Sequence, residues 1–194
     1  MRLAVASTCV FFATTAPARA DVGLPMIFIS LPGMLIALVP IIIVETLVLS
    51  RRVALQNHAI VLKAVALSNT VSTLFGVPIA WMILVALQIG TGGARSYGIQ
   101  SLFGKILAVT WQAPWLIPYE SDLDWMVPAA SVVLLVPFFA ASWFIELRVN
   151  RRMLPEVDER TLRRATRDAN LLSYLLLAGV AGGWLAAVLF RRGA

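Results

Sequence analysis

The feature that most constrains this chain is a set of polar residues that recurs, inside apolar segments, at one fixed spacing. Identical leucines or alanines would mean little in so apolar a sequence, but matching glutamate, arginine, asparagine and serine at one offset is harder to obtain by chance. The pattern predicts two copies of one membrane hairpin, each with an acid near the end of its first helix and an amide near the start of its second. The identical positions, 101 residues apart, are Glu45, Val48, Arg51, Ala64, Asn69, Ser72 and Leu74 in the first copy and Glu146, Val149, Arg152, Ala165, Asn170, Ser173 and Leu175 in the second.

Composition indicates an integral membrane protein. The 194 residues are 60% hydrophobic and only 13% charged, whereas charged residues make up about 25% of a typical soluble domain. The apolar residues form runs of roughly 20 residues, which is the length that a helix needs to cross ~30 Å of hydrocarbon. The formal charge of +6 comes largely from arginines that flank these runs, and it gives no indication of nucleic acid binding.

The first twenty residues have the pattern of a secretory signal peptide. Arg2 supplies a positive start, residues 3–12 a short apolar core, and Ala18-Arg19-Ala20 a cleavage site before Asp21. The alternative is an uncleaved first helix, although this apolar core is too short to span a bilayer. Cys9 is the only cysteine, so a mature chain that begins at Asp21 has no disulfide, thiolate nucleophile or sulfur-ligated metal.

The remaining residues predict an all-α fold of four transmembrane helices in two tandem hairpins of the same topology. We expect one domain, residues 21–194, with the first hairpin at about 24–90, a periplasmic interfacial segment at 91–125 and the second hairpin at about 126–190. Pro40 and Pro137 should kink the first helices of the two hairpins. Pro32-Gly33 is a predicted break, and residues 53–68 are a predicted surface helix that runs into the second span.

Two further segments have recognisable membrane patterns. Residues 99–117 mix apolar side chains with Lys105, Trp111 and Trp115, which favours a helix lying on the bilayer surface, because tryptophan prefers the headgroup level. In the last span Gly179 and Gly183 form a small-xxx-small pair, a pattern that allows close helix approach. We expect the single histidine, His58, to be solvated. The acidic group Glu120, Asp122 and Asp124 is expected to form a solvated turn, with loose Ca²⁺ binding as the alternative.

The positions of lysine and arginine predict the orientation. Ten of them lie in residues 51–68 and 148–168, whereas the segment between the hairpins holds only Arg95 and Lys105. By the positive-inside rule the first two segments are cytoplasmic. The mature N-terminus is then periplasmic in a bacterial-type inner membrane. Arg191 and Arg192 fall on the outer side and are the exception.

The repeated polar residues form the candidate polar or ion site. Glu45 precedes Arg51 by six residues, which places it ~9 Å deeper in the membrane, and Glu146 stands in the same relation to Arg152. One interpretation is structural, with each glutamate hydrogen-bonded to its neighbouring asparagine and each serine packing between helices. The other brings both acids together as a site for a proton or hard cation. The candidate residues are Glu45, Asn69, Ser72, Glu146, Asn170 and Ser173.

Catalytic signals are weak, so no catalytic, cofactor-binding or metal site is predicted. The sequence has no histidine pair, nucleophile motif or phosphate-binding glycine loop. An intramembrane hydrolase that uses Glu45 and Glu146 has no other support. The first hypothesis is therefore a non-catalytic partner or scaffold subunit of a larger membrane assembly, in contact with lipid and with another membrane protein or a second copy. The rival is a small proton- or cation-coupled transporter that uses the two glutamates.

Overall fold

The computed structural model describes residues 26–53, 57–92, 98–115 and 121–193, and the regular elements within them are all helices. Four helical stretches are long and apolar enough to cross a membrane, at residues 32–52, 58–90, 123–153 and 159–193. The predicted all-α fold with four such helices is therefore confirmed, whereas the predicted signal peptide lies outside the described residues. In chain order the elements are α2 (Met26–Arg52), α3 (His58–Val71), the π-helical η1 (Ser72–Gly76), α4 (Val77–Gly92), α5 (Leu102–Thr110), α6 (Leu123–Met153) and α7 (Glu159–Gly193).

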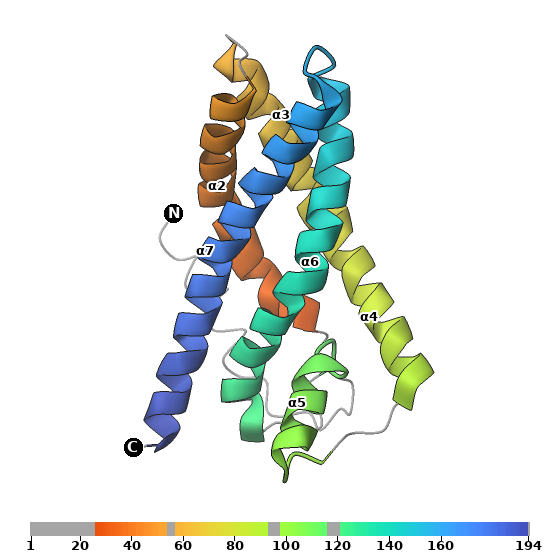
Figure 1. Cartoon of the computed structure of the whole chain (residues 1–194). Coiled ribbons are helices and arrows are strands. Elements are labelled where there is room, and N and C mark those ends of the chain that lie inside the picture. Colours follow the sequence, from red (N-terminus) through yellow and green to blue (C-terminus); the bar gives the residue numbers. More distant parts are fainter. Residues whose placement is uncertain (1–25, 54–56, 93–97, 116–120, 194) are drawn as a thin grey trace, which may run out of the picture.

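The long helices form an elongated bundle. The turns that join α2 to α3 and α6 to α7 lie at one end of it, and α5 lies at the other (Figure 1). Within each hairpin α2 packs on α3 and α6 packs on α7, while α2 also contacts α7 and α3 contacts α6. Each hairpin therefore presents both of its helices to the other hairpin, which creates a common junction.

Two local expectations were wrong. The helix α2 runs through Pro32-Gly33 without a break, although its ribbon changes direction part-way along (Figure 1). A proline inside a helix removes a backbone bond and bends the helix without necessarily ending it. The segment expected as a surface helix is instead α3, which begins at His58 and buries Val61, Ala64 and Val65 in the bundle.

The second span contains a widened turn. The π-helical residues of η1 lie between α3 and α4 and end two residues before Pro78. Proline has no N–H to give to the carbonyl four residues earlier, and a π turn is a common way to absorb such a defect. Gly76, the last residue of η1, lies so close to α6 that an added Cβ would be 3.0 Å from the Ile145 side chain. The glycine therefore permits the close approach of η1 to α6.

Two apolar clusters hold the bundle together. One lies near the short turns and contains Leu49, Val61 and Leu162, and the other contains residues of α4, α5 and α6, including Ala108 and Phe138. Along α6, Phe138 belongs to one cluster and Leu154 to the other. Glu146 lies midway between them, so the candidate polar residues occupy the layer between two apolar cores.

The helix α5 is shorter than the predicted surface helix and packs against α6. Its Ala108 and Val109 are buried in the apolar cluster, whereas Leu102 and Phe103 on its other side are exposed. The Nζ of Lys105 lies 5.9 Å from the ring centre of Trp125, at the start of α6. One face of α5 thus belongs to the protein core, and the exposed face keeps the apolar character expected at a bilayer surface.

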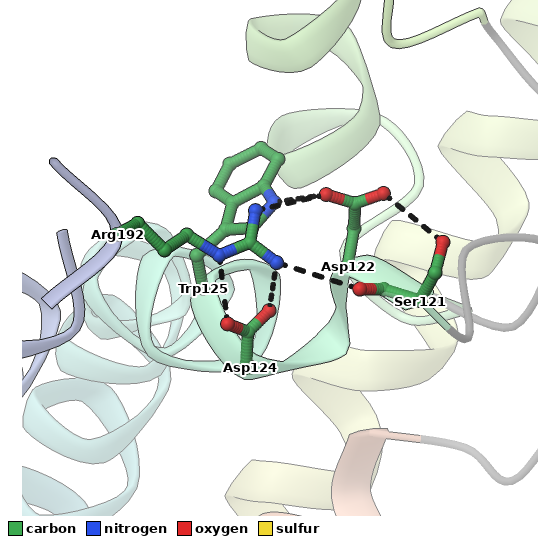
Figure 2. A network of polar contacts seen from close by, with 5 residues as sticks. All are labelled: Ser121, Asp122, Asp124, Trp125 and Arg192. Carbon is green, nitrogen blue, oxygen red and sulfur yellow. Dashed lines mark hydrogen bonds and ion pairs between the residues drawn. The ribbon is translucent and has the colours of Figure 1, made fainter.

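The end of α7 is attached to the start of α6 by a polar network (Figure 2). The Arg192 guanidinium donates to both carboxylate oxygens of Asp124 and, at 3.1 Å, to Asp122, which also accepts a 2.8 Å bond from the Trp125 indole. These hydrogen bonds, first from Trp125 and then from Arg192, lower the pKa of the Asp122 carboxyl below its ordinary value. Asp124 is exposed and Asp122 partly exposed, as expected, but both are also paired with Arg192, which was not expected, whereas Glu120 lies outside the described residues.

Candidate functional site

The six predicted site residues come together in one buried cluster at the junction of the hairpins. Glu45 comes from α2 and Glu146 from α6, and each keeps only 2% of its surface exposed. Their partners lie on the returning helices and are 0–4% exposed: Asn69, Ser72, Asn170 and Ser173. The structure thus brings together all six residues, whereas the sequence left open whether the two acids share one site.

Within each hairpin the acid binds its own asparagine. The Nδ2 of Asn69 donates to Glu45 Oε2 at 2.7 Å, and the Nδ2 of Asn170 donates to Glu146 Oε2 at 2.6 Å. Each amide also donates to the backbone carbonyl one turn earlier, at 3.1 and 3.2 Å. These contacts match the structural interpretation, in which glutamate and asparagine fix the two helices of a hairpin.

Across the junction each acid binds the serine of the other hairpin. The Oγ of Ser173 donates to Glu45 Oε1 at 2.5 Å, and the Oγ of Ser72 donates to Glu146 Oε1 at 2.9 Å. Every carboxylate oxygen of the pair therefore accepts a hydrogen bond, one from the same hairpin and one from the other. This exchange of serines was not anticipated from sequence, because sequence spacing cannot tell which helix a serine on one face will meet.

The two carboxyl groups lie in the same cluster and are close enough to interact electrostatically. No lysine, arginine or histidine of the described residues is hydrogen-bonded to either of them or forms an ion pair with them. Two like charges buried without a cation are costly, because no opposite charge compensates them. The cluster thus holds its acids by neutral donors alone.

The serines have a second acceptor within reach. The Oγ of Ser72 lies 3.1 Å from the backbone carbonyl oxygen of Asn69, and the Oγ of Ser173 lies 3.0 Å from that of Asn170. A hydroxyl group has one hydrogen to donate but can also accept. Each serine can therefore donate to the carboxylate, or donate to the backbone carbonyl and accept from a protonated carboxyl group.

Two further polar pairs flank the Glu146–Asn170 pair along α6 and α7, and the sequence interpretation missed them. One turn closer to the short turns, Asn150 Nδ2 donates to Thr166 Oγ1 at 3.4 Å, and one turn the other way Ser142 Oγ and Tyr174 Oη are 2.9 Å apart. On each helix the three positions are separated by four residues, so they share one helix face. The spacing from Glu146 and Asn170 would have revealed these pairs.

The first hairpin has no such flanking polar pairs at the corresponding positions. There Leu49 and Val65 stand 101 residues before Asn150 and Thr166, and both are buried in the apolar cluster. Ile41 and Thr73 correspond to Ser142 and Tyr174. The two hairpins are therefore alike at the glutamate and asparagine and different on both sides of them.

The other residues singled out from sequence lie away from this cluster. The His58 side chain is exposed at the start of α3, and Gly179 and Gly183 on α7 have nothing within 4 Å of an added Cβ. Trp81 of α4 packs against Trp115 with ring centres 5.3 Å apart. The glycine pair therefore makes no close helix contact within the described chain.

Comparison with protein-family models, with curated proteins and with solved structures gives no match for this chain. Its function must therefore be argued from the geometry of the cluster.

Proposed function

We propose that this chain is a small membrane transporter in which Glu45 and Glu146 together bind a proton, and that release of this proton is coupled to solute movement across the membrane. The observation that carries the proposal is the meeting of two buried carboxyl groups in one hydrogen-bonded cluster, in which no cation of the described residues is paired with either acid. A purely structural attachment of the hairpins has no need of two acids, since amides or hydroxyls would form the same hydrogen bonds without like charge. One proton shared by the two carboxyl groups removes the repulsion between them. The pair then carries one negative charge, which is stabilised by four donors, the two asparagine amides and the two serine hydroxyls.

The hydrogen-bond donors favour a proton over a hard metal cation. Asn69, Asn170 and the two serines all direct N–H or O–H groups at the carboxylate oxygens, whereas a cation such as Na⁺ or Ca²⁺ requires oxygen ligands. A proton fits without rearrangement of the asparagines. The serines can reverse their hydrogen bonds because each has a backbone carbonyl as its alternative acceptor.

The second candidate is the non-catalytic scaffold or partner subunit. The observation that favours it is the unoccupied glycine face of α7, where Gly179, Gly182 and Gly183 have open space. Such a face is suited to close contact with a helix of another membrane protein or of a second copy. In this case the acid cluster serves only to hold the hairpins together.

The bounds of the helices support an internal repeat, which the proposal assumes. Arg52 and Met153 end the first helices of the hairpins, and His58 and Glu159 begin the second ones, with 101 positions between the members of each pair. The contacts of α2 with α7 and of α3 with α6 are equivalent under a two-fold relation of the hairpins.

We further propose a periplasmic mature N-terminus, after cleavage of residues 1–20, in a bacterial-type inner membrane. Arg191 and Arg192 are the exception to the positive-inside rule, because this orientation places them on the outer side. They count less against the assignment because the charge of Arg192 is paired with Asp122 and Asp124. A reporter fused after Glu159 should read cytoplasmic and one after Ser121 periplasmic, and the purified protein should begin at Asp21. The opposite reporter pattern, or an intact Met1, would overturn this assignment.

Conservative variants of the acids test the transport function. Glu45→Gln and Glu146→Gln retain hydrogen-bonding capacity but cannot take up the proton, so each should abolish pH-driven proton flux into vesicles that contain the purified protein. The midpoint of thermal unfolding in detergent should stay close to that of the wild type. Ser142→Ala is a matched control, because it removes a buried hydrogen bond of α6 without touching the acids, and its flux should persist. Wild-type flux in both glutamine variants would leave the scaffold as the better proposal.

A further inference from the structure

We propose that α6 carries a binding site for an anionic phospholipid, in which Arg148 and Arg152 hold the headgroup phosphate and Phe144 lies against an acyl chain. The site is on the outer surface of the bundle, toward the end where the short turns join the helices of each hairpin (Figure 1). It is separate from the acid cluster and does not depend on the proposed proton transport. It requires only that α6 spans the membrane, which its length and apolar composition support.

The three residues follow one another along one exposed face of α6. They are separated by four positions each, which places them on the same side of a helix. Phe144 keeps 58% of its surface exposed, and both arginines are exposed as well. The guanidinium carbon of Arg148 lies 3.4 Å from the centre of the Phe144 ring. Its charge therefore rests on the aromatic face, as cation–π attraction favours.

Neither Arg148 nor Arg152 forms an ion pair within the described chain. The acids of α6 itself are Asp124, in its first turn, and Glu146, which is buried in the junction. Residues 51–53, 57–68 and 148–168 together hold ten lysines and arginines but only four acids. Unpaired charges on a lipid-facing surface require a counter-charge from outside the chain. The ion pairs that do form at this end are Arg52–Asp168, Arg167–Asp168 and Arg151–Glu159.

The depth of the two arginines matches that of a phospholipid phosphate. The helix α6 has 31 residues, so it is about 46 Å long, close to the ~40–45 Å of a bilayer with its headgroups. Trp125, near the other end of α6, suits the opposite interface. Arg152, in the last turn, then lies at headgroup level, Arg148 ~6 Å deeper and Phe144 ~12 Å deeper, within the hydrocarbon.

The chemistry of these side chains favours an anionic phospholipid over other anions. Guanidinium groups bind phosphate oxygens through paired N–H···O bonds, and residues four apart on a helix are close enough to share one phosphate. A soluble anion could use the two arginines but would leave the Phe144 ring without a contact. A zwitterionic headgroup brings a cation of its own, which the surrounding basic residues repel. A lipid with a net negative headgroup satisfies the charge, the depth and the apolar contact together.

Lipid binding to the purified protein in non-ionic detergent measures this site. Native mass spectrometry resolves bound lipid as phosphatidylglycerol or phosphatidylcholine is titrated in. The wild type should bind phosphatidylglycerol at least tenfold more tightly than phosphatidylcholine. The double variant Arg148→Gln with Arg152→Gln should raise the Kd for the first bound phosphatidylglycerol about tenfold. Phe144→Ala should raise it by a smaller factor, because only the acyl-chain contact and the support of Arg148 are lost.

The matched control is the double variant Arg160→Gln with Arg164→Gln. It removes two exposed arginines with the same spacing, at the same end of the bundle, but from α7. The next position on that face is Asp168, which already pairs with Arg52 and Arg167. The Kd for phosphatidylglycerol in this variant should change less than twofold. Equal weakening in both double variants would mean diffuse attraction to the basic end and would overturn the site on α6.

Two further outcomes would contradict the proposal. Equal affinity of the wild type for the two lipids would rule out selection of an anionic headgroup. Displacement of phosphatidylglycerol by an equal concentration of soluble glycerol phosphate would assign the arginines to a soluble anion instead of a lipid. The exposed positions of Arg148 and Arg152 predict that their variants fold normally, checked by thermal unfolding without added lipid. If the double variant does not fold, Arg152→Gln alone should still raise the Kd, and an unchanged Kd would overturn the site.

Discussion

The two hairpins differ most on either side of the junction. At the junction both carry a glutamate, an asparagine and a serine, and these side chains bond across to the opposite hairpin as well as within their own. One turn away, α6 and α7 pair Asn150 with Thr166, whereas α2 and α3 carry Leu49 and Val65. A residue that serves both hairpins cannot change alone, because its loss leaves buried donors without acceptors in both. A pair whose hydrogen bond lies within one hairpin can change as a unit.

The helix that returns from each junction also differs. In the first hairpin it contains the π turn η1 before α4, whereas in the second it is the uninterrupted α7. Pro78 explains part of this, since it follows the serine of the first hairpin, whereas Gly179 occupies that place in the second. Matching residues at the junction therefore coexist with different paths for the chain beyond it.

The largest effect that can test this comparison is expected from removal of either acid. Glu45→Leu leaves the Asn69 amide and the Ser173 hydroxyl without their carboxylate, and Glu146→Leu does the same to Asn170 and Ser72. Each should lower the free energy of unfolding by about 1–3 kcal/mol, the cost of unsatisfied buried groups. The two losses should be nearly equal, measured by thermal or denaturant unfolding in detergent.

The comparison of the two losses in unfolding free energy tests whether both hairpins depend equally on the junction. The glutamine variants are matched controls, since they keep a hydrogen-bonding side chain of the same length and should retain most of the stability. A large loss in one leucine variant with none in the other would contradict the view that both hairpins depend equally on the junction.

A smaller effect is expected at the far end, where only the second hairpin is held by Arg192. Arg192→Gln should lower the thermal midpoint by no more than about 2 °C, because exposed ion pairs contribute little. The pKa of Asp122 is lowered in the folded state from its ordinary 3.8, so its stabilisation is present above that value. It is lost as the pH falls through the lower folded pKa. The difference between wild type and variant should therefore be constant near neutral pH and shrink below about pH 4.

High salt should reduce the same difference, since screening weakens exposed charges. Lys105→Gln is a suitable control because it removes a basic side chain at the same end without an ion pair to these acids. An Arg192 effect that is independent of both pH and salt would mean that the side chain acts by packing.

Much of the fold and part of the site followed from sequence alone. Apolar runs of helical length determined the four long helices, because a backbone in hydrocarbon must satisfy its own hydrogen bonds. The repeated spacing identified Glu45, Asn69, Ser72 and their counterparts, because polar groups are rare and costly in such runs. The bounds of α3 and the continuity of α2 through Pro32 were not predicted, because both depend on which faces pack against neighbouring helices.

The tertiary structure alone decided how those residues combine. Each serine binds the acid of the other hairpin, and the two carboxyl groups become neighbours, because α2 packs on α7 and α3 on α6. The tertiary structure also decided that Asn150 pairs with Thr166 beside the acids, since this contact depends on the antiparallel register of α6 and α7. Local sequence sets which groups a helix carries and on which face. Only the packing of helices distant in sequence sets which groups meet, since those contacts depend on the summed fit of both surfaces.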